Sequence, residues 1–325
     1  MKVGVVGAGA IGVWIAARLA AAGVDVVVLA RGATLEAIRA RGLRLRDASG
    51  DTTVKVTAGT GAELGVVDVL VVAVKGPALA GAARAARPMI DPHTIIVPML
   101  NGVPWWFVAG ELGAEPLQSI DPGGAIERAL PSSQVIGCVV HASCSSPEPG
   151  LSVPKMTDAL ILGEPKGAPS ERLRTVAVLL GEAGLPVRPS AKIRYEVWYK
   201  LWGNMTMNPI SALTGATCDR ILDDPLVEKL VLNIMHEAAA LGARIGCAIP
   251  QSGSDRNAVT RTLGAFKTSM LQDVEAGRPI ELDLLLAAPR EIAARLAMPT
   301  PFIDSLFGLT RLFAESRGLY RREDG

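Results

Sequence analysis

The chain has 325 residues, of which 49% are hydrophobic and 20% charged, and its formal net charge at pH 7 is +1. This length allows one large domain or two ordinary domains, and the scattered lysines and arginines exclude the basic patch typical of nucleic-acid binding. No uninterrupted apolar run approaches the roughly 18 residues of a membrane span. The chain starts with an expected strand rather than a signal peptide, so we expect a cytoplasmic protein without a membrane partner.

The cysteines and histidines indicate neither a disulfide framework nor a metal site. The four cysteines have no CxxC or other paired spacing, and the three histidines do not lie at ligand spacing from one another. We therefore expect reduced, mostly buried thiols and no metal. The chemistry would then come from lysine, asparagine, serine and carboxylate side chains.

The first 31 residues have the order strand, glycine turn, helix, strand that the dinucleotide-binding fingerprint requires. Apolar residues 3–6 precede the turn, and residues 26–30 form a second apolar run. Gly7 would make the tight turn, Gly9 would let a pyrophosphate approach the backbone, and Gly12 would allow close packing of helix on strand. The predicted cofactor-binding turn consists of Gly7, Ala8, Gly9, Ala10, Ile11 and Gly12.

Arg31 stands at the tip of the second strand, where an NAD-binding site usually places Asp or Glu on the ribose 2′-hydroxyl. Asp25 lies before that strand, so no carboxylate occupies the tip. A guanidinium can bind a 2′-phosphate through two hydrogen bonds, whereas a carboxylate would repel it. Arg31 therefore predicts NADPH as the cofactor. The alternative is an arginine that only closes a loop beside a generic nucleotide site.

Two further apolar runs, residues 67–74 and 94–99, predict buried parallel strands separated by a helix. Strands that alternate with helices predict a doubly wound parallel sheet, with ligands beyond the carboxyl ends of its strands. Lys75 and Asn101 follow two such ends, so we expect both to face the cofactor. The alternatives are a lysine that extends into solvent and ordinary Asn-Gly turn chemistry.

The character of the sequence changes near residue 190. Before it, residues 104–107 (PWWF) predict buried packing, residues 135–163 predict antiparallel strands that extend the sheet, and residues 171–182 predict a helix. After it, helical patterns cover residues 193–213, 225–245, 254–276, 284–296 and 301–317, and residues 321–325 read as a frayed tail. We therefore predict domains over residues 1–189 and 190–325.

The helix expected after residue 193 carries a polar stripe. Lys200, Asn204 and Asn208 are spaced four residues apart and share one face. Two asparagines in an otherwise apolar helix are costly unless each amide finds a partner. The stripe would suit a small ligand with carboxylate, carbonyl and hydroxyl groups. The alternatives are a face in solvent and amides that tie helices together.

A second polar group follows in residues 268–283. A helix that carries Ser269 should end at Gly277, because Gly277 and Pro279 both terminate helices, and a new helix should start near Glu281. The chain turns back there, so Ser269 and Glu281 could meet. Considered alone, Glu281 and Asp283 are equally well explained as acids in the first turn of a helix.

Together these motifs resemble the ketopantoate reductase (2-dehydropantoate 2-reductase) family. The likeness rests on the glycine turn, Arg31, Lys75, Asn101-Gly102 and two C-terminal patterns. These patterns are K-L-x-x-N-x-x-x-N-P from Lys200 to Pro209 and S-M-x-x-D-x-x-x-G-R-x-x-E-x-D from Ser269 to Asp283. The likeness runs nearly end to end, and the C-terminal patterns are far more specific than the glycine turn.

The resemblance implies a Rossmann-type domain followed by an all-α domain like that of 6-phosphogluconate dehydrogenase. It implies reduction of ketopantoate to pantoate by NADPH, in pantothenate biosynthesis. Lys200 would be the general acid, and Glu281 would accept a hydrogen bond from the 4-hydroxyl. Substrate contacts would come from Asn204, Asn208, Ser269 and Asn101, and Lys75 and Asn101 would help place the cofactor. An acid of this kind suits the chemistry, because hydride transfer to a ketone leaves charge on oxygen.

Two alternatives remain open. Residues 284–287 are wholly apolar, where the family usually continues toward an Asn-Gly pair, so the substrate could be a different, more apolar 2-keto acid. The chain could also be a non-catalytic NADPH-binding sensor on the same fold, although a sensor has no need of an acid such as Lys200. The helical half would also suit a homodimer surface.

Overall fold

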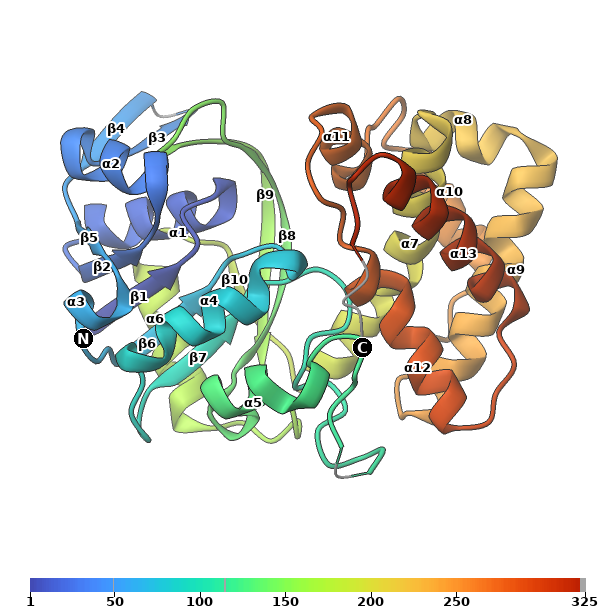
Figure 1. Ribbon diagram of the computed structural model, residues 1–325, viewed down its shortest axis with the longest axis horizontal. Helices are drawn as coiled ribbons and strands as arrows, with labels where there is room; N and C mark the ends of the chain where they lie inside the picture. The colour runs from blue at the N-terminus through green and yellow to red at the C-terminus, as the bar shows by residue number, and fades with distance from the viewer. Residues whose placement is uncertain (49, 114, 322–325) are drawn as a thin grey trace. The chain divides into compact units, whose positions relative to one another are not determined.

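The computed structural model describes residues 1–48, 50–113 and 115–321. Contacts divide the chain into two compact units (Figure 1). The first unit comprises Met1–Leu100, Trp105–Ala109 and Gly123–Arg194, and the second comprises Asn101–Pro104, Gly110–Pro122 and Tyr195–Gly325. Asn101 thus belongs to the second unit, although it follows a strand of the first. The domain boundary predicted at residue 189 remains a prediction. Of the tail predicted for residues 321–325, only Arg321 is among the described residues.

The first unit is built on a parallel five-stranded sheet in the order β5-β2-β1-β6-β7. Its strands are β1 Lys2–Val6, β2 Asp25–Leu29, β5 Thr57–Gly59, β6 Val69–Val72 and β7 Ile95–Pro98. Counted along the chain this order is 3-2-1-4-5, and the order reverses between β1 and β6, as in doubly wound folds. The predicted Rossmann-type sheet is confirmed. Apart from Lys2 at the start of β1, strands β1 and β6 are apolar and buried, as is typical of parallel strands covered on both faces.

Helices of the first unit connect and cover these strands (Figure 1). The α-helices are α1 Ala10–Ala21, α2 Gly32–Arg41, α3 Gly61–Leu64, α4 Leu79–Ala86, α5 Ala125–Ala129 and α6 Glu171–Glu182. The short 3-10 turns are η1 Gly76–Ala78, η2 Arg87–Met89, η3 Pro122–Gly124 and η4 Ser132–Gln134. Helix α6 has the bounds that the sequence predicts, and its N-cap Ser170 accepts a hydrogen bond from Leu173 N.

A second, mixed sheet corrects one expectation. It has the order β10-β9-β3-β4, with β8 antiparallel to β9. Its strands are β3 Leu43–Asp47, β4 Gly50–Val54, β8 Gly137–Ser145, β9 Leu151–Gly163 and β10 Val187–Pro189. The prediction that β8 and β9 extend the parallel sheet is wrong, because β9 uses its backbone groups to pair with β3, β8 and β10. Val135, just before β8, forms an isolated bridge with Ile96 of β7.

The aromatic cluster at residues 105–107 is buried packing, as predicted. Trp105, Trp106 and Phe107 are each less than 5% exposed. Trp105 Nε1 donates a hydrogen bond to Leu130 O at 3.0 Å. A Cβ added to Gly137 on β8 would lie 2.8 Å from the Trp106 ring, so Trp106 packs directly on that strand's backbone.

The second unit is helical. Its elements are α7 Ile193–Thr214, α8 Cys218–Asp223, α9 Pro225–Arg244, α10 Gly253–Arg261, α11 Ser269–Glu275, the π-helix η5 Asp283–Ala287, α12 Ala288–Arg295 and α13 Pro301–Ser316. The single helix predicted over residues 254–276 is wrong, since Gly264 adopts φ +62° and ends the first part. Thr268 then caps α11 by accepting a hydrogen bond from Leu271 N. Helix α8 and the π-helix were not predicted.

The cysteines follow the prediction of reduced thiols. None of the four forms a disulfide, and Cys138, Cys218 and Cys247 are buried. Burial raises the pKa of Cys144 and Cys218 to about 11, so both thiols stay protonated at neutral pH. Within the described residues there is no metal-binding group of His, Cys, Asp and Glu, and no helix there could cross a membrane.

Candidate active site

The glycine turn of the first unit has the geometry of a dinucleotide-binding loop. Gly7 adopts φ +96°, and a Cβ on Gly12 would lie 1.9 Å from Gly7 O, so neither position accepts a larger residue without rearrangement. A Cβ on Gly9 would meet nothing within 4 Å, so the protein itself does not require glycine there. Helix α1 begins after Gly9 with no capping side chain and no acid in its first turn. Its N–H groups therefore suit a pyrophosphate.

Arg31 lies two residues beyond the end of β2, as predicted. Its side chain is exposed, and it occupies the N-cap position of α2, whose first turn contains no acid. The charge near this strand end is therefore positive. A guanidinium at this place is able to bind a phosphate group.

Lys75 and Asn101 have equivalent places in the chain. Each lies three residues after a parallel strand, Lys75 after β6 and Asn101 after β7. Lys75 is exposed at the N-cap of η1 in the first unit, and Asn101 is half-buried in the second. That both face the cofactor remains a prediction.

The backbone next to Asn101 is held by the π-helix. Val103 N donates to Leu284 O at 2.8 Å. Gly102 adopts φ +75°, and a Cβ there would lie 2.3 Å from the same carbonyl oxygen. Only glycine permits this approach, so the Asn-Gly pair serves more than ordinary turn chemistry. The contact fixes Asn101 relative to the segment that carries Glu281.

Lys200, Asn101 and Glu281 form a connected polar group within the second unit. Lys200 Nζ donates to Asn101 Oδ1 at 2.9 Å, and Asn101 Nδ2 donates to Glu281 Oε2 at 3.4 Å. Glu281 is only 8% exposed. The Asn101 amide presents its oxygen to the cation and its NH₂ group to the carboxylate, which fixes its orientation electrostatically. The resemblance implies that both Lys200 and Glu281 lie near substrate, but the sequence contains no local sign that Asn101 links them.

The asparagines of the α7 stripe have an unusual environment. Asn204 is half-buried and Asn208 is 6% exposed. Neither side chain makes a hydrogen bond or ion pair with another residue of the described chain. The structure thus shows neither a face in open solvent nor amides that tie helices together. These two amides therefore have hydrogen-bonding capacity that no described residue uses.

Ser269 lies near the C-terminal part of this helix. Ser211 Oγ, one turn after Asn208, is 2.5 Å from Thr268 Oγ1, and the adjacent Ser269 is the exposed first residue of α11. The Ser211–Thr268 contact was not predicted, although Thr-Ser before an apolar run is a recognisable capping pattern. The predicted reversal also occurs: α11 ends at Glu275, and Gly277 turns the chain with φ +63°. That Ser269 and Glu281 meet at one site remains a prediction.

Comparisons with known proteins agree with this geometry. The family models "Ketopantoate reductase PanE/ApbA" and "Ketopantoate reductase PanE/ApbA C terminal" match residues 3–167 and 192–314. A 2-dehydropantoate 2-reductase of Mesorhizobium japonicum is 42% identical over 98% of this chain and 100% of its own length. The chain belongs to the ketopantoate reductase family. It is accordingly an oxidoreductase of a nicotinamide-dependent family.

Solved structures support the same assignment. A candidate ketopantoate reductase from Ralstonia solanacearum MolK2 has 53% identity and a TM-score of 0.94, with 98% of this chain and 99% of that chain covered. A D-mandelate dehydrogenase, solved with NADH and anilino(oxo)acetate, has a TM-score of 0.83 at 20% identity, with 98% and 100% covered. The second likeness concerns the fold alone.

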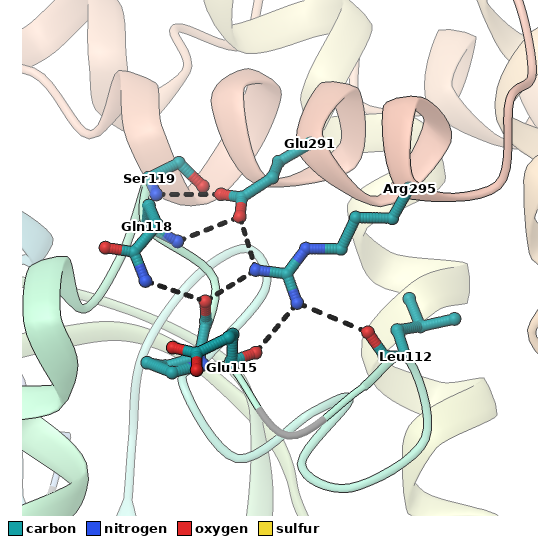
Figure 2. Close-up of polar contacts among 7 residues, drawn as sticks. Leu112, Glu115, Gln118, Ser119, Glu291 and Arg295 are labelled. Carbon is teal, nitrogen blue, oxygen red and sulfur yellow. Dashed lines mark hydrogen bonds and ion pairs between the residues drawn. The ribbon is translucent and has the colours of Figure 1, made fainter.

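This member of the ketopantoate reductase family also anchors the segment of its second unit that precedes η3. Glu291 on α12 accepts hydrogen bonds from Gln118 N at 2.9 Å and Ser119 N at 2.8 Å (Figure 2). Arg295 pairs with Glu291 at 2.6 Å and donates to three backbone carbonyl oxygens, those of Leu112, Glu115 and Pro116. Burial raises the pKa of Glu291, but the hydrogen bonds from Ser119, Gln118 and Arg295 outweigh it and hold that pKa below its ordinary value.

Proposed function

We propose that this protein reduces 2-dehydropantoate (ketopantoate) to pantoate with NADPH. The observation that carries the proposal is the 2.9 Å hydrogen bond from Lys200 Nζ to Asn101 Oδ1. This bond holds the ammonium group of Lys200 in place. Lys200 lies on the same helix as Asn204 and Asn208, whose side-chain amides bond to no described residue. The relative named 2-dehydropantoate 2-reductase supports the choice of substrate.

Lys200 would act as the general acid. Bound NADPH supplies the hydride, and its arrival at the keto carbon leaves negative charge on the carbonyl oxygen. Lys200 Nζ would donate a proton to that oxygen and recover one from solvent afterwards. Asn101 accepts a hydrogen bond from Nζ and so limits the directions in which the ammonium group can point. The acid is thus preorganised before substrate binds.

The remaining polar groups would bind the substrate. Asn204 and Asn208 carry amides able both to donate and to accept hydrogen bonds, which suits the carboxylate and keto groups of a 2-keto acid. Ser269 would contact the carboxylate end. Glu281, an acceptor when ionised, would accept a hydrogen bond from the 4-hydroxyl of ketopantoate.

The glycine turn and Arg31 would bind NADPH, with Lys75 helping to place it. Arg31→Ala should raise the KM for NADPH about 10- to 100-fold, because a charge-assisted hydrogen bond to the 2′-phosphate is lost. The KM for NADH should change little. Equal changes for both cofactors would contradict the role of Arg31.

The buried leucines of the π-helix do not argue for a more apolar substrate than ketopantoate. Leu284, Leu285 and Leu286 are each at most 3% exposed. Their apolar character is therefore explained by core packing rather than by contact with a ligand. The departure from the family pattern at residues 284–287 thus gives no reason to assign a different keto acid.

The test is the oxidation of reduced nicotinamide by the purified protein. Ketopantoate should be compared with a panel of branched and aromatic 2-keto acids, with NADPH and NADH in parallel. Rapid turnover of ketopantoate with NADPH is the expected result. Activity only on another keto acid would reassign the substrate and keep the mechanism. Tight NADPH binding without turnover of any keto acid would indicate a sensor and overturn the proposal.

A further inference from the structure

The C-terminal segment, residues 317–321, returns to the part of the chain that carries Glu281. Helix α13 ends at Ser316, and Gly318 turns the chain with φ +67°. In Figure 1 the red chain beyond α13 runs back toward the start of the helical segment that continues into α12. Leu319 O accepts a hydrogen bond from Ile280 N at 3.0 Å, and Tyr320 Oη donates to Asp283 Oδ1 at 2.6 Å. One bond precedes Glu281 and the other follows it.

Glu281 needs such support because it lies outside regular structure. It stands between the turn after α11 and Leu282, which begins the helical segment. The following turn is a π-helix, closed by a hydrogen bond from Ala288 N to Asp283 O. π-Helical turns are rare and frequently occur at functional sites. No α-helical or β-sheet ladder fixes the backbone of Glu281, so contacts of the neighbouring residues help to hold it, alongside the hydrogen bond from Asn101 Nδ2 to its carboxylate.

The Tyr320–Asp283 bond is also suited to hold the segment in one position. Burial and then the Asp283 carboxylate raise the pKa of Tyr320, so its hydroxyl remains a donor at physiological pH. A hydrogen bond to an ionised carboxylate is roughly twice as strong as one between neutral groups. Tyr320 is half-buried and Leu319 is 5% exposed, so the contact is partly shielded from water.

We propose that Tyr320 is a positioning residue, which holds Glu281 in place through Asp283 for recognition of the substrate hydroxyl. Tyr320 touches neither substrate nor cofactor in this proposal. The inference rests on the proposed function, in which Glu281 binds the 4-hydroxyl of ketopantoate. It assigns a role in substrate selection to the last described residues of the chain.

The decisive measurement compares two substrates. Tyr320→Phe removes the donor and keeps the ring, so kcat/KM for ketopantoate should fall about tenfold. With the same keto acid lacking its 4-hydroxyl, the change should stay within about twofold, because Glu281 then has no hydroxyl to bind. Ser316→Ala, which removes an exposed hydroxyl of the same region that bonds to Phe313 O, is the matched control and should affect neither substrate. An equal loss on both substrates, or no loss, would overturn the proposal.

Two further variants distinguish loss of the Tyr320–Asp283 bond from a general loss of folding. Asp283→Asn keeps an acceptor and should give a smaller loss than Tyr320→Phe. Because the two residues act through one bond, the double variant should be little worse than Tyr320→Phe alone. Fully additive losses would contradict coupling through this bond.

Failure of the proposed function can be separated from failure of this inference. If the wild-type protein does not reduce ketopantoate, the proposed function alone is refuted. Hydrogen exchange then decides the role of Tyr320, since Tyr320→Phe should accelerate exchange of the backbone amides of residues 280–284 relative to Ser316→Ala. Unchanged exchange in this segment would refute it.

Discussion

Asn208 is 6% exposed, yet its side-chain amide bonds to no residue of the described chain. Ser211, one turn later, is a useful contrast, because its hydroxyl contacts both Asn208 O and Thr268 Oγ1. A polar group without a partner destabilises the free protein, whereas a partnered one stabilises it. Residues kept for ligand binding commonly show this conflict between stability and activity.

We predict opposite effects on stability for these neighbours. Asn208→Leu should leave the melting temperature unchanged or raise it by a few degrees, while kcat/KM for the keto acid falls at least about tenfold. Ser211→Ala should lower the melting temperature, since Thr268 Oγ1 then keeps only its hydrogen bond from Leu271 N. Thermal unfolding and steady-state kinetics of both variants check this. A destabilised Asn208→Leu would mean that the amide has a structural role.

At the scale of elements, α12 connects two parts of the second unit. It continues directly from the π-helix that bonds to Val103, and its Glu291 and Arg295 bind the backbone of Leu112, Glu115, Pro116, Gln118 and Ser119 (Figure 2). The side chain of Glu291 is 20% exposed. Because its folded-state pKa lies below the ordinary value, ionised Glu291 stabilises the fold above the unfolded-state pKa, and this contribution is lost as pH falls through the folded-state pKa.

Glu291→Gln should therefore destabilise the protein by about 1 to 3 kcal/mol at neutral pH. The difference from wild type should shrink below about pH 4, where the unfolded carboxyl group is protonated as well. Thermal unfolding between acidic and neutral pH measures this. Glu275→Gln, which breaks an exposed pair with Lys267, is the control and should have little effect at any pH. A pH-independent difference would contradict the assignment to Glu291 ionisation.

At the scale of the molecule, all the predicted cofactor residues except Asn101 belong to a different compact unit from the predicted acid. The glycine turn, Arg31 and Lys75 lie in the first unit, and Lys200 lies in the second. Cofactor affinity and chemistry should accordingly respond to different substitutions.

Lys200→Ala should lower kcat about 10²- to 10⁴-fold, the usual contribution of a general acid. The Kd of NADPH, measured by fluorescence titration, should stay within about twofold of wild type. A kcat that remains unchanged would exclude Lys200 as the acid. A large loss of NADPH affinity would instead place Lys200 at the cofactor.

Sequence reasoning succeeded where the physical cause is local. The buried strand β6, the bounds of α6 and the turn at Gly277 follow from apolar runs, caps and glycine conformations within a few residues. It failed where the outcome depends on a distant partner. The pairing of β9 with β3 joins residues about a hundred positions apart, and the π-helix at Asp283 has an ordinary helical sequence pattern.

The sequence by itself determined the doubly wound sheet, the glycine turn, the positive strand tip at Arg31 and the polar stripe on α7. Each follows from periodicity and spacing, which depend on neighbours in the chain. The tertiary structure alone decided that Asn101 belongs with Lys200 and Glu281, that the α7 amides bond to no described residue, and that Tyr320 reaches Asp283. These contacts join residues 37 to 180 positions apart. They are set by the packing of whole elements, which no local pattern specifies.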